Sequence, residues 1–131
     1  MTRTNTDQGK KLLTETELEL MTIVWRLGEG SVNDVIKNLP EHRQLAYTSV
    51  STILRILEKK NVLTSRKNGK SHIYTPALSK SDYEHRSLGH LLSNVFSGVP
   101  TSLVRTLVDS DELSPEDLTE IKKIISHRLD Q

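Results

Sequence analysis

The strongest constraint on the fold is the order in which the hydrophobic patterns follow one another along the chain. Three helical patterns come first, at about 14–28, 31–39 and 47–60, and each repeats its apolar residues every three or four positions. Two short strand-like runs, 62–65 and 72–75, then flank Asn68-Gly69, a dipeptide that favours a tight hairpin turn. The three helices must therefore pack with one antiparallel hairpin that directly follows them.

Helix-capping residues bound these predicted elements. Residues 14–17 read Thr-Glu-Thr-Glu, the pattern of a capping box, and Ser31 opens the second helix. Gly28 and Asn61 suit the left-handed residue that ends a helix, and Pro40 stops the second helix. We therefore predict a mainly α chain with a winged helix-turn-helix, made of three helices and a β-hairpin wing, over residues 12–77.

The charge is distributed unevenly although the net charge is only +1. Residues 43–76 contain seven Lys or Arg and one acid, Glu58, whereas residues 79–131 contain six Lys or Arg and nine Asp or Glu. A stretch of +6 inside a nearly neutral chain predicts a face that binds a polyanion.

The third helix and the wing, at about 47–60 and 64–74, carry the candidate nucleic-acid contacts. Short hydroxyl side chains at a helix start can approach phosphates and base edges, and Arg can reach a guanine or a phosphate. Cations on a hairpin tip suit contact with the phosphate backbone, whereas Lys59 and Lys60 fit a helix-dipole role equally well. The predicted DNA-binding residues are Tyr47, Thr48, Ser49, Ser51, Thr52, Arg55, Arg66, Lys67 and Lys70.

The remainder of the chain is predicted to be a polar N-terminal tail, 1–11, and a helical dimerisation domain, 78–131. Three short helices in that domain carry apolar stripes that they cannot bury on one another alone, so we expect a second copy of the chain to bury them. The chain is therefore predicted to form a homodimer with itself. The predicted dimerisation residues are Leu88, Leu91, Leu92, Val95, Leu103, Val104, Leu107, Val108, Leu118, Ile121, Ile125 and Leu129.

Several classes of protein are excluded by what the sequence lacks. It has no cysteine, and therefore no disulfide framework, thiolate metal site or Cys nucleophile. Its start has no apolar signal-peptide core, and no apolar run approaches the length of a membrane span. We find no phosphate-binding loop, nucleophile motif or metal-ligand spacing. We therefore expect a cytoplasmic protein that is not an enzyme and uses no cofactor or metal.

Four segments carry a resemblance to a known family. They are TETELELMTIVW at 14–25, YTSVSTILRILEKKNVL at 47–63, YTP at 74–76, and the region from 102 to 118 that ends ELSPEDL. Through them, Leu12–Gln131 resembles the penicillinase and methicillin-resistance repressors (BlaI/MecI). The resemblance implies a homodimeric repressor that binds an inverted-repeat operator on double-stranded DNA and controls β-lactam resistance or a related stress response.

The same resemblance implies a way of switching the repressor off. In such systems a membrane-bound sensor and protease relay leads to cleavage of the repressor in its dimerisation helix. The relatives are cut at an Asn–Phe bond, and the matching positions in this sequence are Thr106 and Leu107.

Two other functions fit the residue patterns. One is a winged-helix protein–protein interaction module whose basic face docks an acidic partner. The other is a DNA-binding regulator that is released by a ligand, or an activator. A repressor should prefer an inverted repeat, whereas an interaction module should show little dependence on DNA sequence.

Overall fold

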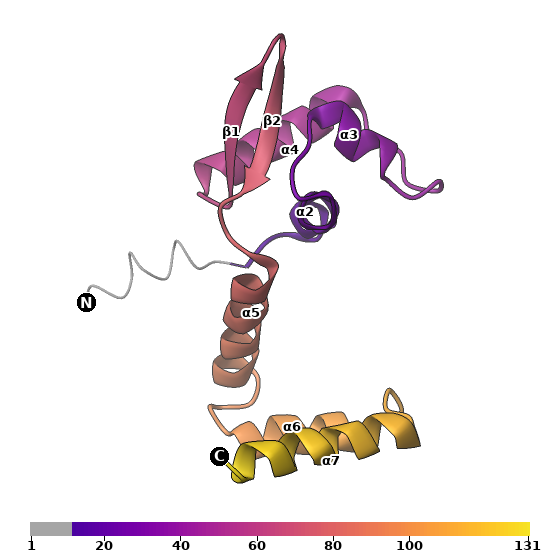
Figure 1. The fold of residues 1–131 in the computed structure, drawn as a ribbon, viewed down its shortest axis with the longest axis vertical. Helices are drawn as coiled ribbons and strands as arrows, with labels where there is room; N and C mark the ends of the chain where they lie inside the picture. The colour runs from indigo at the N-terminus through magenta and orange to yellow at the C-terminus, as the bar shows by residue number, and fades with distance from the viewer. Residues whose placement is uncertain (1–11) are drawn as a thin grey trace, which may run out of the picture. The chain divides into compact units, whose positions relative to one another are not determined.

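The protein is described by a computed structural model over residues 12–131, and the predicted 1–11 tail lies outside the described residues. The predicted order of three helices, a hairpin and further helices is confirmed (Figure 1). The elements are α2 (Glu15–Leu27), α3 (Val32–Lys37), α4 (Tyr47–Lys59), β1 (Leu63–Asn68), β2 (Ser71–Pro76), α5 (Lys80–Asn94), α6 (Pro100–Asp109) and α7 (Pro115–Leu129).

Local capping explains where the first helices begin and end. The Thr14 Oγ1 accepts a hydrogen bond from the Glu17 N–H, and the Thr14 N–H donates to Glu17 Oε1 at 2.9 Å, which completes the predicted capping box. Ser31 and Asp34 form the same reciprocal pair at the start of α3. Gly28 has φ 88°, a backbone conformation that favours glycine at the end of a helix.

The core of the winged helix is built from one face each of α2, α3 and α4, closed by the hairpin. Apolar side chains on those helices are spaced to lie on one face, so their burial follows from the sequence pattern. Helical spacing groups Leu18 with Met21 and Val24 and so predicts that it lies on the apolar face of α2. That prediction is wrong, because Leu18 is 36% exposed while the flanking Leu20 and Ile23 are buried. The fully buried residues are Leu20, Met21, Val24, Val35, Val50, Leu54, Leu57 and Leu63.

The wing is longer than predicted. The strands pair from Leu63 opposite Pro76 to Asn68 opposite Ser71, so the turn contains only Gly69 and Lys70. The strand-like run that ends at 65 predicts a turn over 66–70, which is too wide, because Arg66 and Lys67 have paired partners across the hairpin. A long hairpin carries its cations along a strand, and successive side chains on a strand point to opposite faces.

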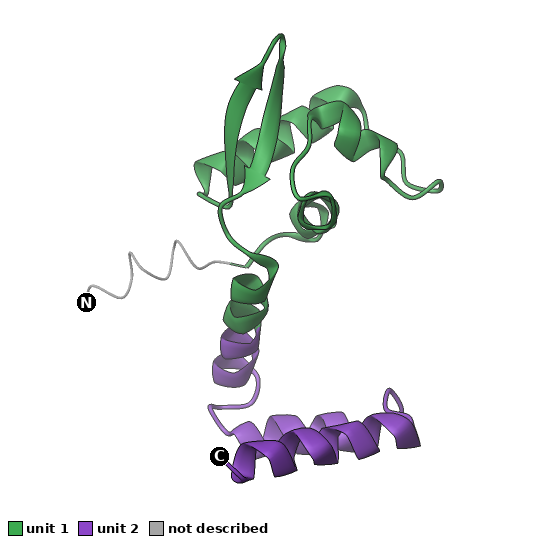
Figure 2. Ribbon diagram, in the orientation of Figure 1, with its two compact units in different colours: residues 1–87 green, residues 88–131 purple. Residues whose placement is uncertain are grey.

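The start of α5 belongs to the same compact unit as the wing. The Trp25 Nε1–H donates to the Leu78 carbonyl at 2.9 Å, and the Trp25 and Tyr83 rings lie 5.7 Å apart. The Tyr83 hydroxyl also accepts from the Leu13 N–H at 3.0 Å. Two compact units result, which divide within α5 at Ser87 and Leu88 (Figure 2).

An ion pair joins the start of α2 to the end of α4. The Lys60 Nζ donates to both carboxylate oxygens of Glu17, at 2.8 and 3.0 Å, and Glu17 is only 7% exposed. Burial alone would raise the pKa of the Glu17 carboxyl, but hydrogen bonds from Lys60 and Thr14 outweigh it and hold the pKa below its ordinary value. Lys60, ambiguous from sequence, therefore has a structural partner.

We predict that Glu17→Gln lowers the free energy of unfolding at neutral pH by about 1 to 3 kcal/mol, because charge-assisted hydrogen bonds are lost. A carboxyl with a lowered pKa stabilises the fold above its unfolded pKa, and that stability is lost as the pH falls through the folded value. The difference between the variant and the natural chain should therefore shrink below pH 4.5. Urea unfolding across pH tests this, with the exposed Glu15→Gln as control; equal losses in both variants would contradict it.

Candidate nucleic-acid interface

The outer face of α4 is polar and basic. Val50, Leu54 and Leu57 are buried, which turns the opposite side of the helix to solvent. Positions 48, 52, 55 and 59 lie on that opposite side at spacings of three or four, and all four are exposed. They are Thr48, Thr52, Arg55 and Lys59, so the outer face combines two hydroxyls with two cations.

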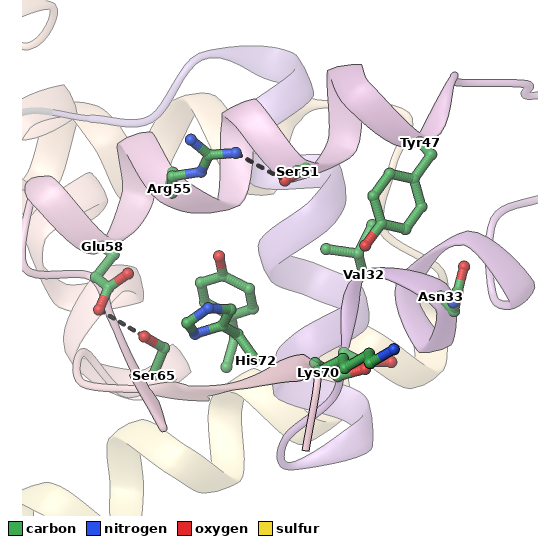
Figure 3. Close-up of a pocket in the computed structure, with 12 residues that line it drawn as sticks. Val32, Asn33, Tyr47, Ser51, Arg55, Glu58, Ser65, Lys70 and His72 are labelled. Atoms are coloured by element: carbon green, nitrogen blue, oxygen red, sulfur yellow. Dashed lines mark hydrogen bonds between the residues drawn. The ribbon is translucent and has the colours of Figure 1, made fainter. Parts of the chain in front are cut away.

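A groove separates α4 from the wing and is lined by residues that are far apart in sequence (Figure 3). The Arg55 Nη2–H donates to Ser51 Oγ at 3.3 Å along one wall, and the Ser65 hydroxyl donates to Glu58 Oε2 at 2.7 Å across it. The lining residues are Ser31, Val32, Asn33, Tyr47, Ser51, Arg55, Glu58, Ser65, Lys70, Ser71, His72 and Tyr74.

The two faces of the wing differ in how they lie relative to the groove. Ser65 and Lys67 lie opposite Tyr74 and His72 on one face, and three of these four residues line the groove. Arg66 lies on the other face, opposite Ile73, by the alternation of a strand.

The Arg66 guanidinium is engaged by Glu29 in the turn between α2 and α3. The Arg66 Nη1 and Nη2 donate to the two carboxylate oxygens of Glu29, at 2.9 and 3.1 Å. These hydrogen bonds lower the pKa of Glu29 and raise that of Arg66. Within residues 12–131, Lys67 and Lys70 form no ion pair, so the wing presents these two as its free cations.

The nine predicted DNA-binding residues are thus divided among three places. Tyr47, Ser51, Arg55 and Lys70 line the groove, while Thr48, Ser49, Thr52 and Lys67 are exposed beside it. Arg66 is held by Glu29 on the far face of the hairpin.

Sequence reasoning missed Asn33 and His72 as groove residues. The start of α3 was interpreted only as a cap, although a helix-turn-helix brings the start of its first helix beside the second. His72 could have been found from the hairpin register, because it lies directly opposite Lys67.

Residues 88–131 contain no buried side chain. Nine of the twelve predicted dimerisation residues are exposed, and Leu92, Leu103 and Ile121 are half-buried. The sequence missed Ile124, which is 60% exposed on α7. The exposed nine are Leu88, Leu91, Val95, Val104, Leu107, Val108, Leu118, Ile125 and Leu129.

Thr106 and Leu107 lie inside α6, and both are exposed. The Thr106 hydroxyl donates to the Ser102 carbonyl, one helical turn earlier, at 2.9 Å.

Within residues 12–131, no group of three or more His, Asp or Glu side chains is placed to hold a metal ion. None of the helices in that range is long and apolar enough to span a membrane.

Comparison with known proteins identifies relatives over most of the chain. The family model described as penicillinase repressor matches residues 13–127. The penicillinase repressor of Bacillus licheniformis is 30% identical over 113 residues, which cover 86% of this chain and 88% of that protein. The methicillin resistance regulatory protein MecI of Mammaliicoccus sciuri is 24% identical over 88% of this chain and 94% of its own length.

Among solved structures, the DNA-binding domain of the repressor BlaI is 34% identical, with a TM-score of 0.49, over 54% of this chain and 87% of that domain. The family match extends through the winged helix and nearly to the end of α7. This chain belongs to the penicillinase repressor family.

Proposed function

We propose that this chain is a homodimeric, sequence-specific DNA-binding transcriptional repressor. The observation that carries the proposal is the outer face of α4, where hydroxyls and cations lie beside a wing whose two lysines form no ion pair within residues 12–131. Relatives that cover most of the chain are named as repressors of penicillinase and as a regulator of methicillin resistance. The family is one of repressors and not of enzymes, which agrees with the function class predicted from sequence.

In the proposed complex, α4 enters the major groove, which is wide enough for one helix. Thr48 and Thr52 are short and lie on the outer face, where they can donate to base edges or phosphates. Arg55 can reach a guanine edge or a phosphate from the same face. Tyr47, Ser49 and Ser51 border this surface at the start of the helix.

Lys67 and Lys70 are assigned to the phosphate backbone beside the groove. Both are exposed and project from the hairpin rather than from the core. Contacts of this kind position a protein on DNA and contribute affinity that depends on salt, whereas base contacts supply the sequence preference.

The unit formed by residues 88–131 is assigned to dimerisation. Its side chains are all at least partly exposed, so its apolar stripes remain to be covered by a second copy. Two winged helices related by a two-fold axis would bind two half-sites in opposite orientation, which requires an inverted repeat. Joining them makes the second half-site contact intramolecular and raises the affinity of the pair.

Regulation by cleavage is proposed at Thr106–Leu107, through a sensor and protease relay like that implied for such repressors. Because this bond lies inside α6, the helix must unwind before a protease can hold the backbone in an extended form. Cleavage there would divide the apolar stripe of Leu103, Val104, Leu107 and Val108. The dimer would then lose part of its interface, and with it the gain in affinity from joining two half-sites.

The experiment that tests the repressor assignment is selection of bound sequences from a random pool of duplex DNA by the full chain. Enrichment of one inverted repeat with fixed half-site spacing supports a dimeric repressor. Binding without sequence preference would favour the interaction-module alternative, and enrichment of single, unpaired half-sites would remove the dimeric arrangement.

We predict that Lys67→Gln and Lys70→Gln each weaken binding to all duplex DNA by a similar factor. Each variant should also reduce the slope of log affinity against log salt by about 0.9, the value for one phosphate contact. Titrations over a range of salt concentrations measure both effects. Lys122→Gln on α7 is the matched control, and unchanged slopes in both wing variants would remove the wing from the interface.

A second prediction concerns sequence preference. Thr52→Ala and Ser49→Ala should each cost about 1 to 3 kcal/mol on the selected inverted repeat if they contact bases. The cost on scrambled DNA should be much smaller, because non-specific binding depends on phosphates. Thr119→Ala on α7 controls for removal of an exposed helical threonine. Equal losses on both DNAs would restrict these side chains to phosphate contacts.

A third prediction concerns the division of labour between the two units. A fragment ending at Ser87 keeps the Tyr83 and Leu78 contacts of the core and should be a folded monomer. Its affinity for the inverted repeat should be lower than that of the full chain by about 10²-fold or more, the scale expected when two winged helices are no longer linked in one dimer. Sedimentation and DNA titration test this; a dimeric fragment, or one that binds as tightly as the full chain, would contradict it.

A further inference from the structure

Glu29 occupies a fixed place between α2 and α3. The residue before it, Gly28, ends α2 in a left-handed conformation with φ 88°. The residue after it, Gly30, is buried and exchanges two backbone hydrogen bonds with Tyr74 on β2, at 3.0 and 2.8 Å. The backbone of Glu29 is therefore anchored on both sides, and its carboxylate is held next to the wing.

The wing residue that Glu29 holds is a cation of the kind that binds phosphate. Arg66 donates through both ends of its guanidinium, a bidentate geometry that is also the one used for phosphate groups. The carboxylate thus occupies the phosphate-binding edge of the Arg66 side chain. Both side chains are about half exposed, at 57% and 50%, so the pair is open to solvent and to competing anions.

We propose that Glu29 is a positioning residue that keeps Arg66 away from DNA and so raises the preference of this protein for its operator over other DNA. The proposal rests on the DNA-binding function proposed above. Arg66 lies on the face of the hairpin turned away from Tyr74 and His72, which line the groove beside α4. When α4 is docked in the major groove, that face points away from the helix.

Release of Arg66 from Glu29 should change binding to the operator less than binding to other DNA. On the operator, contacts by α4 fix the orientation of the winged helix, so a released Arg66 has little access to phosphates. On other DNA, binding is mainly electrostatic and many orientations are allowed, so a released guanidinium would add a phosphate contact. An exposed ion pair is weak, so a DNA phosphate can compete with Glu29 for Arg66. The stronger the Glu29–Arg66 pair, the less Arg66 contributes to the affinity for non-specific DNA.

The test compares Glu29→Gln with the natural chain on two duplexes, the selected inverted repeat and a scrambled sequence of the same length. Affinity for scrambled DNA should rise about threefold at low salt, and the salt slope should increase by about 0.9, the effect of one added phosphate contact. Affinity for the inverted repeat should change less, so the ratio of the two affinities falls. Unfolding curves check that the exposed substitution leaves the fold intact.

Two controls separate release of Arg66 from a general loss of negative charge. Glu41→Gln removes an exposed carboxylate that forms no ion pair within residues 12–131, and it should leave the salt slope unchanged. In an Arg66→Gln background, Glu29→Gln should give no gain on scrambled DNA.

Three results would overturn the proposal: an equal gain from Glu41→Gln, a gain that persists without Arg66, or a loss of affinity for both duplexes in Glu29→Gln. Failure of the natural chain to bind either duplex would instead refute the DNA-binding function itself. The two failures are thus distinguishable.

Discussion

One short backbone contact ties the wing to the turn between α2 and α3. Gly30, in the turn before α3, pairs with Tyr74 of β2 through two hydrogen bonds, at 3.0 and 2.8 Å. Tyr74 is itself buried, so the same residue joins the hairpin to the turn and to the core. Gly30 suits this position because an added Cβ would lie 3.2 Å from the Asp34 Cβ, in the capping box of α3. This contact holds the wing beside the start of α3, and residues from the wing, the start of α3 and α4 together line the groove.

The features that could be predicted from the sequence are those set by near neighbours. The capping pairs at Thr14 and Ser31 join residues three positions apart, and the hairpin signal at Asn68-Gly69 lies within one residue of the observed Gly69-Lys70 turn. The outer face of α4 likewise follows from helical spacing alone. This is why the fold and the outer face of α4 could be derived without knowledge of tertiary contacts.

The features that the sequence could not specify depend on residues far apart in the chain. Arg66 and Lys67 are neighbours with the same charge, and only the hairpin register and the approach of Glu29, 37 residues away, separate their environments. The boundary of the winged helix also depends on a distant contact. The Leu13 N–H donates a hydrogen bond to the Tyr83 hydroxyl, 70 positions away, and the start of α5 thereby joins the core. Leu18 fits the helical spacing, yet packing leaves it exposed.

Only part of the excess positive charge in residues 43–76 is available to bind a polyanion, because some of these cations are paired with acids elsewhere in the chain. Three of its seven cations form ion pairs with acids outside that stretch: Arg43 with Glu19, Lys60 with Glu17, and Arg66 with Glu29. These pairs fasten α4, the loop before it and the wing to α2 and the turn that follows it. The other four form no ion pair within residues 12–131, and all are exposed on α4 or the wing; they are Arg55, Lys59, Lys67 and Lys70. The acids of α2 and its turn thus divide the cations of this stretch into those that already have an acidic partner and those that are left for a polyanion.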